Sequence, residues 1–161
     1  MFDAGIQYPE HDCLFAAEVY FMWNCSEEYH YLVFISHSGK DRWIAKQMAN
    51  LIEEKGREYN VKTFLDEKDI EGGDSISESI RESIEKCNEF LVLLSRYSID
   101  REWVLIEIGA AWGLRKRIIA ITDKVAPEEM PDIITPYKAI DLNSFEEYLD
   151  QLINRAKEAR K

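Results

Sequence analysis

One carboxylate stands out in a stretch that is otherwise apolar. Glu107 is the single charged residue of the twelve residues Trp103–Leu114, whose length and composition are typical of a buried helix. Trp103 precedes Glu107 by four residues, so the indole and the carboxylate share one face of the predicted helix. Burying a carboxylate among apolar groups is costly unless it lies at a cleft or has a partner. Glu107 is therefore a candidate functional acid. The alternative is a glutamate at a solvent edge, with Trp103 in the core.

A second group of polar residues follows the first predicted strand. Ser36-His37-Ser38 directly ends an apolar run of strand-forming residues. These side chains either line a binding site or belong to a turn, in which His37 caps the next helix. We interpret the aromatic side chains of Trp43 and Trp112 as packing residues of the core rather than as platforms for a ligand.

Several common chemistries are excluded by missing motifs. A P-loop is absent because Gly39-Lys40 is followed by Asp41 and lacks the upstream glycine. The sequence also lacks GxGxxG after the first strand, a GxSxG elbow and an HExxH motif. A calcium loop starting at Asp66 would place Lys68 and Ile70 at ligand positions, which neither can fill with a carboxylate. A phosphorylatable receiver would need an aspartate where Ser95 ends the third strand.

The acidic composition of the chain argues against some classes of binding partner. The 161 residues carry 20 Lys and Arg against 31 Asp and Glu, a net charge of −11. Such an acidic chain lacks the basic surface that nucleic acids and anionic membranes require. Three cysteines without CxxC spacing indicate reduced thiols, and we expect no metal site. Neither a signal peptide nor a transit peptide is recognisable, so we expect a cytoplasmic protein with neither nucleic-acid nor membrane partners.

The elements that must position these residues alternate between strand and helix. Hydrophobic patterning predicts five strands, at Tyr31–Ile35, Val61–Phe64, Phe90–Leu94, Arg117–Ile121 and Tyr137–Ile140. Helices are predicted at Asp41–Lys55, which Gly56 ends, and at Trp103–Leu114. Two further helices are predicted to begin at capping boxes, one at Ser75–Glu78 and one at Asn143–Glu146.

This alternation predicts an α/β fold with a flavodoxin-like five-stranded parallel sheet of order 2-1-3-4-5 and helices on both faces. Ligands bind such sheets outside the carboxyl ends of the strands, at the switch point between strands 1 and 3. We expect residues 31–161 to form this domain. Residues 1–30 are an acidic extension, with at most one short amphipathic helix that covers an exposed face or contacts a partner.

Four pieces of the sequence, in order, resemble Toll/interleukin-1 receptor (TIR) domains of the bacterial type. Tyr31–Asp41 is similar to their first-strand motif, and Asp66–Ile84 to their BB loop and following helix. Phe90–Ser95 is similar to their third strand, and Trp103–Glu107 to their WxxxE motif. The resemblance spans roughly Leu32 to Leu152.

The resemblance implies an NAD⁺ glycohydrolase or ADP-ribosyl cyclase that cleaves the nicotinamide–ribose bond, with NAD⁺ as substrate and without a cofactor. It assigns Glu107 as the catalytic residue. It also nominates residues that bind the substrate: Ser36, His37, Ser38, Ile70, Gly73 and Trp103. Animal NAD-cleaving members carry arginine where Ser38 stands and an aromatic residue where Ser75 stands, so those two contacts do not carry over.

The resemblance also implies partners and a role. The BB loop, Asp66–Asp74, is expected from the resemblance to join copies into a homo-oligomer, although its acidic composition by itself favours a solvated surface loop. If it pairs with a neighbouring subunit, the basic run Arg115–Arg117 is its candidate partner. A free-standing TIR enzyme resembles the signal-making component of Thoeris-like antiphage systems, whose product activates a separate effector, and a virulence role is the competing one. The alternative function is a non-catalytic TIR scaffold that acts through homotypic contacts.

Overall fold

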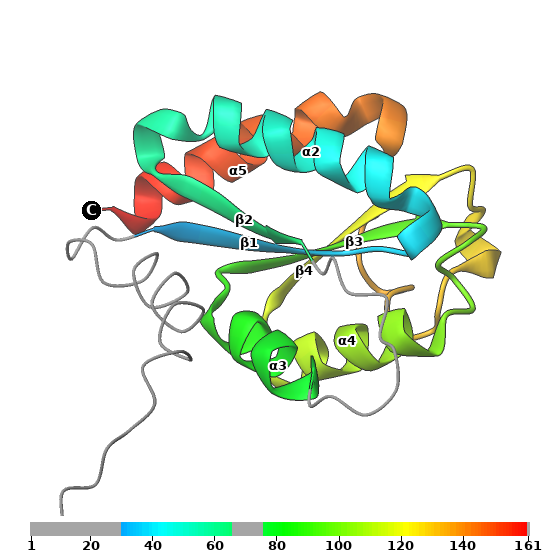
Figure 1. Cartoon of the computed structure of the whole chain (residues 1–161). Coiled ribbons are helices and arrows are strands. Elements are labelled where there is room, and N and C mark those ends of the chain that lie inside the picture. Colours follow the sequence, from blue (N-terminus) through cyan, green and yellow to red (C-terminus); the bar gives the residue numbers. More distant parts are fainter. Residues whose placement is uncertain (1–29, 66–75, 161) are drawn as a thin grey trace, which may run out of the picture.

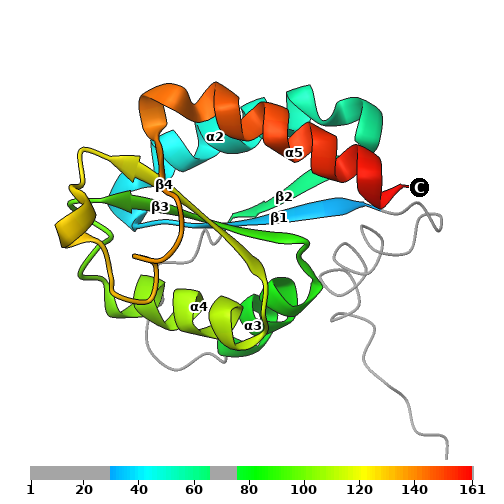
Figure 2. The same cartoon turned by 180° about the vertical axis from the view of Figure 1, so that it is seen from behind.

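A parallel sheet organises the described part of the chain. The computed structural model describes residues 30–65 and 76–160. Within them the strand order is β2-β1-β3-β4-β5, and all neighbouring strands are parallel. Helices cover both faces of the sheet, as the two opposite views show (Figure 1 and Figure 2). The predicted flavodoxin-like order is therefore confirmed.

The elements begin and end close to the predicted positions. The strands are β1 (Tyr31–Ser36), β2 (Val61–Leu65), β3 (Glu89–Ser95), β4 (Arg117–Asp123) and β5 (Ile140–Asp141). The α-helices are α2 (Arg42–Lys55), α3 (Ile76–Lys86), α4 (Glu102–Gly113) and α5 (Phe145–Ala159). The described residues also include the short 3₁₀ helices η1 (Gly39–Asp41), η2 (Arg57–Tyr59), η3 (Pro127–Glu129) and η4 (Leu142–Ser144).

Alternation along the strands divides the core between the two faces. Successive strand residues point to opposite faces, so Val33 and Ile35 pack with α2 and α5, whereas Phe34 packs with α3 and α4. The two helix pairs lie on opposite sides of the sheet (Figure 1). The same parity directs Ser36, the next residue of β1, toward α4. The sheet therefore fixes on which face each polar side chain at its carboxyl edge lies.

The fifth strand and the last helix begin later than predicted. The sequence pattern placed the strand at Tyr137–Ile140, but the amide of Tyr137 donates to the carbonyl of Ile134 at 2.8 Å and closes a turn after Pro136. The strand is consequently reduced to Ile140–Asp141. The predicted capping box Asn143–Glu146 is also wrong. Asp141 caps η4 by accepting from the Asn143 amide at 2.8 Å, and the α5 N-cap, Ser144, makes no side-chain cap.

Gly56 ends α2, as predicted, for a reason of space. A β-carbon built at Gly56 would lie 2.4 Å from the Cβ of Val61, the first residue of β2. Its φ of −88° needs no glycine. The left-handed residue of this connection is Asn60, with φ 54°. The glycine therefore permits a close approach of helix and strand.

Two tryptophans predicted to be core residues are exposed. Trp43 is 73% exposed and Trp112 is 57% exposed. The buried stripe of α2 runs through Ala45, Met48 and Ile52, and Trp43 lies on the opposite face. The prediction of core packing for both indoles was wrong because residue type was weighed above helical phase.

Candidate functional site

Glu107 and Ser36 form the centre of the candidate site. Glu107 on α4 is only 2% exposed, and Ser36 at the end of β1 is fully buried. The Ser36 hydroxyl donates to Oε2 of Glu107 at 2.5 Å, which is the length of a charge-assisted O–H···O⁻ bond. A residue of the first strand and a residue of the WxxxE-like helix, 71 positions apart, are thereby joined. The alternative of a solvent-edge glutamate is excluded.

The two residues after Ser36 play different parts. His37 is 9% exposed, and its Nδ1 lies 3.5 Å from the carbonyl oxygen of Ile35. Ser38, which is 3% exposed, is the N-cap of η1 and accepts from the Lys40 amide at 3.4 Å. The capping role that the sequence suggested for His37 therefore belongs to Ser38. Both residues stay at the carboxyl edge of the sheet beside Ser36.

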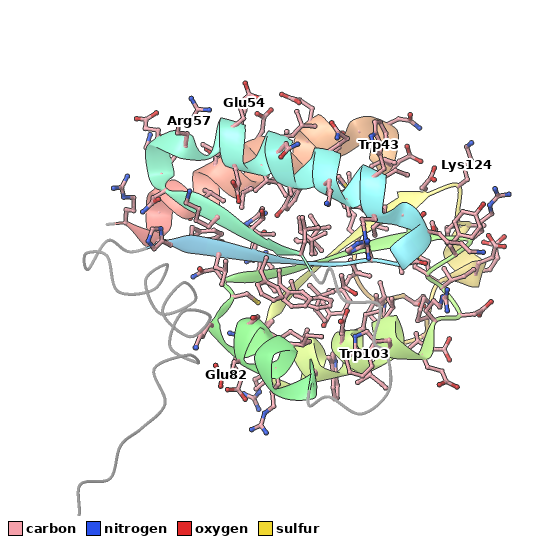
Figure 3. All side chains as sticks on the ribbon, in the orientation of Figure 1. Trp43, Glu54, Arg57, Glu82, Trp103 and Lys124 are labelled. Carbon is pink, nitrogen blue, oxygen red and sulfur yellow. The ribbon has the colours of Figure 1, made fainter. Side chains whose placement is uncertain are left out.

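Trp103 lies in the first turn of α4, one turn before Glu107. It is half-buried and packs against the apolar cluster between the sheet and the helices α3 and α4. Figure 3 shows its side chain on this helix. The buried stripe of α4 is formed by Val104, Glu107, Ile108 and Ala111. Glu107 therefore occupies a core position of the helix, at the level where the β1 strand ends.

A second acid at the same edge was not singled out from the sequence. Asp41 is 3% exposed and accepts from the Ser95 hydroxyl, at the end of β3, at 2.6 Å. Ser98 folds the following turn by donating to the carbonyl of Leu93 at 2.7 Å and accepting from the Ser95 amide at 2.8 Å. Buried polar residues at the ends of β1 and β3 thus tie together the switch point. The signal was present in the position of Ser95, directly after an apolar strand.

A buried ionic cluster lies at the opposite, amino edge. Glu89 is fully buried and accepts from the Tyr31 hydroxyl at 2.6 Å and from the Tyr148 hydroxyl at 3.3 Å. Arg155 of α5 contacts both carboxylate oxygens through Nε and Nη2. Burial, with the charge of Glu89, raises the pKa of both phenols above the ordinary value. This cluster closes the sheet against α5, and its carboxylate is fully hydrogen-bonded.

The remaining nominated residues lie outside the described part of the chain. These are Ile70, Gly73 and the BB loop Asp66–Asp74, together with Ser75. The proposed partner run contains Lys116, whose amine donates to the carbonyls of Glu85 and Cys87 at the end of α3. Within residues 30–65 and 76–160, no three ligand-type side chains gather in a way that could hold a metal ion. None of the helices described there is long and apolar enough to cross a bilayer.

Comparisons with known proteins agree with this architecture. A family model described as a TIR domain matches residues 33–153. In Brachypodium distachyon, the protein named "Probable 2' cyclic ADP-D-ribose synthase BdTIR" is 30% identical over 130 residues, which cover 81% of this chain and 54% of that protein. The chain therefore spans about half the length of this curated relative.

Solved structures show the same fold at lower identity. The TIR domains of the activated Roq1 resistosome are 18% identical, with a TM-score of 0.56, over 81% of this chain and 99% of that one. The TIR domain of the Toll-related receptor TRR-2 from Hydra magnipapillata is 22% identical, with a TM-score of 0.56, over 80% of this chain and 98% of that one.

Proposed function

Because the chain belongs to the TIR-domain family, we propose that it cleaves NAD⁺ at the nicotinamide–ribose bond, with Glu107 as the catalytic residue. The observation that carries the proposal is the buried Ser36–Glu107 pair at the carboxyl edge of the sheet, where α/β folds bind ligands. The Brachypodium relative, whose name is that of a cyclic ADP-ribose synthase, supports this substrate class. His37, Ser38 and Trp103 would then flank the substrate, together with Ile70 and Gly73.

One carboxylate suffices for this reaction. Glycosidases use two because a sugar oxygen must be protonated as it leaves. The pyridinium of NAD⁺ instead leaves as neutral nicotinamide, taking the bonding electron pair, so a general acid is not needed. The ribose becomes an oxocarbenium ion, and a fixed anion beside it stabilises the transition state. Glu107 would accept hydrogen bonds from the ribose hydroxyls, and Ser36 would hold its other side in place.

The second step decides the product. Water attacking the anomeric carbon gives ADP-ribose and releases a proton, whereas a hydroxyl or ring nitrogen of the same molecule gives a cyclic isomer. Exclusion of water favours the cyclic route. We propose a hydrolase or cyclase of this class in a cytoplasmic setting, with antiphage signalling of the Thoeris-like kind as its role and a separate effector as the receiver of its product.

The direct test is nicotinamide release by the purified 161-residue chain, with mass spectrometry of the products. Glu107→Gln is expected to lower turnover by at least about 100-fold, the effect of losing one fixed electrostatic contact in a transition state. Glu102→Gln is the matched control, because Glu102 is exposed on the same helix and the change in charge is identical. Equal turnover in Glu107→Gln and in the wild type would remove the catalytic assignment.

A non-catalytic scaffold is the second candidate. The observation that favours it is an apolar outer face on α4, where Ile106 is 57% exposed, Trp112 57% and Leu105 37%. Exposed apolar patches of this kind are typical of interaction surfaces. Both candidates include self-association, through the BB loop or this face. A specific activity that rises with protein concentration would support both candidates together, because assembly would then activate the enzyme. If no nicotinamide is released at any concentration, only the scaffold function remains.

A further inference from the structure

Two cations and a tyrosine gather where β1 and β3 end. The Lys40 ammonium, in η1 after β1, lies 5.0 Å from the centre of the Tyr97 ring. The Arg96 guanidinium carbon lies 4.7 Å from the same ring, and Arg96 Nη2 donates to the Tyr97 hydroxyl at 2.6 Å. Lys40 and Arg96 come from loops that are 56 residues apart in sequence. Their convergence on one ring is a property of the fold.

In the described part of the chain, neither cation pairs with a carboxylate. None of the ion pairs formed among residues 30–65 and 76–160 includes Lys40 or Arg96. This is unusual in a chain with 31 acids and only 20 lysines and arginines. Like charges repel, and the electron-rich ring face of Tyr97 offsets part of that repulsion. Both cations are exposed and therefore accessible to an anion from solution.

Their position relates them to the candidate site. Lys40 follows Ser36 by four residues, and Arg96 follows Ser95 directly. The strands that carry Ser36 and Ser95 are parallel neighbours, so both loops leave the sheet at its carboxyl edge (Figure 1). The buried bonds Ser36–Glu107 and Ser95–Asp41 hold these two strand ends in place. Lys40 and Arg96 therefore lie in connections at the same edge of the sheet as Ser36, the hydrogen-bond partner of Glu107.

The geometry points to a diphosphate subsite formed by Lys40 and Arg96, with Tyr97 as the positioning residue that holds both cations. This inference rests on the proposed function, since the diphosphate is that of the dinucleotide whose ribose meets Glu107. A guanidinium can bind two phosphate oxygens at once, and an ammonium adds a point charge. Because the diphosphate is remote from the bond that breaks, the subsite contributes binding energy equally to the ground and transition states.

The test measures binding of ADP-ribose, which contains the diphosphate and is not cleaved at the nicotinamide bond, by calorimetry at low salt. The variant Lys40→Gln/Arg96→Gln is expected to weaken its Kd by about 10-fold or more, the effect of losing two charge-assisted contacts. Arg57→Gln/Lys62→Gln is the control, because both residues are exposed, lie away from the carboxyl edge and give the same change in net charge. Its Kd should equal that of the wild type.

Kinetics separate this subsite from the cleavage reaction. For NAD⁺ the double variant is expected to raise KM by a similar factor at unchanged kcat, the signature of lost uniform binding. Tyr97→Ala should have a smaller effect in the same direction and Tyr97→Phe less still, because the ring is retained. Cleavage of nicotinamide riboside, which lacks phosphate, should be equal in all variants.

Three results would overturn the subsite. They are absence of ADP-ribose binding by the wild type, equal Kd in the double variant and the control, and an equal loss of turnover with nicotinamide riboside. Thermal melting of each variant shows that the fold is intact. If the wild type binds ADP-ribose but releases no nicotinamide from NAD⁺, the proposed function fails while the calorimetry still decides the subsite.

Discussion

Breaking the buried pair between Glu89 and Arg155 should destabilise the fold without touching the proposed chemistry. The structure leaves the Glu89 carboxylate fully buried, with Arg155 as its charged partner and the hydroxyls of Tyr31 and Tyr148 as further donors. In Arg155→Met the negative charge keeps two phenol donors but loses its cation. Glu107, at the other edge of the sheet, keeps its bond to Ser36.

The expected loss of stability in Arg155→Met follows from the difference in burial between Glu89 and Arg155. The Arg155 side chain is 19% exposed and Glu89 is 0% exposed, so the carboxylate suffers most when the pair is broken. Removing one partner of a buried pair costs about 3–5 kcal/mol. For a chain of this size that corresponds to a fall in Tm of about 10 °C. Glu89→Gln/Arg155→Met buries no charge, so its loss should be smaller than the sum of the single losses by about 2 kcal/mol.

The assay is urea unfolding of the wild type, both single variants and the double variant, with NAD⁺ cleavage measured on each folded protein. We expect strong coupling in stability and unchanged turnover. Glu107→Gln should show the reverse, with turnover lost. Single losses that add within about 0.5 kcal/mol would refute the claim that the ion pair governs this cluster. If turnover falls in Arg155→Met at urea concentrations too low to unfold the variant, the claim that this cluster is independent of the candidate site is refuted.

Three further predictions follow from buried or close-packed groups. Burial raises the pKa of the Cys87 thiol to about 11 from about 9. In the variant Cys13→Ser/Cys25→Ser, where Cys87 is the remaining cysteine, alkylation of this thiol at pH 8 should therefore be at least about 100-fold slower in the folded protein than in urea. Because burial raises the pKa of Tyr31 in the folded state, this phenol ionises at a lower pH in the unfolded chain than in the folded one. The free energy of unfolding, measured by urea titration, should therefore fall above pH 10, and it should fall less in Tyr31→Phe. Gly56→Ala would place Cβ 2.4 Å from Val61 and should cost about 1–3 kcal/mol in urea unfolding.

The sheet and the central acid could be predicted from the sequence because each follows from a short-range pattern. Apolar strands alternate with amphipathic helices, and this alternation determines a parallel sheet and its edges. The single charge in the segment Trp103–Leu114 marked Glu107 in the same way. The partner of Glu107 required one more step, the parity of β1, which places Ser36 on the same face as Phe34.

Long-range partners and exposure were not predictable from such patterns. Glu89 and Arg155 are 66 residues apart, and neither is unusual within its own segment. The exposure of Trp43 depends on the phase of α2, which the apolar residues Ile44 and Leu51 on neighbouring faces obscure. The late start of β5 depends on a local turn in the proline-bearing loop, which the Tyr137 amide closes and which strand-like hydrophobic patterning alone does not reveal.

The two buried glutamates show how position in the sheet separates structure from proposed chemistry. Glu89 begins β3, where α5 covers the amino edge and Arg155 neutralises the carboxylate; a charge so enclosed serves the fold. Glu107 instead lies where β1 ends and accepts from the Ser36 hydroxyl, at the edge of the sheet where the connections that carry Lys40 and Arg96 begin. Loops at a carboxyl edge can vary without altering the sheet. Under the proposed function, the buried acid at that edge serves the chemistry. Glu107→Gln is therefore expected to lower turnover more than it lowers the free energy of unfolding.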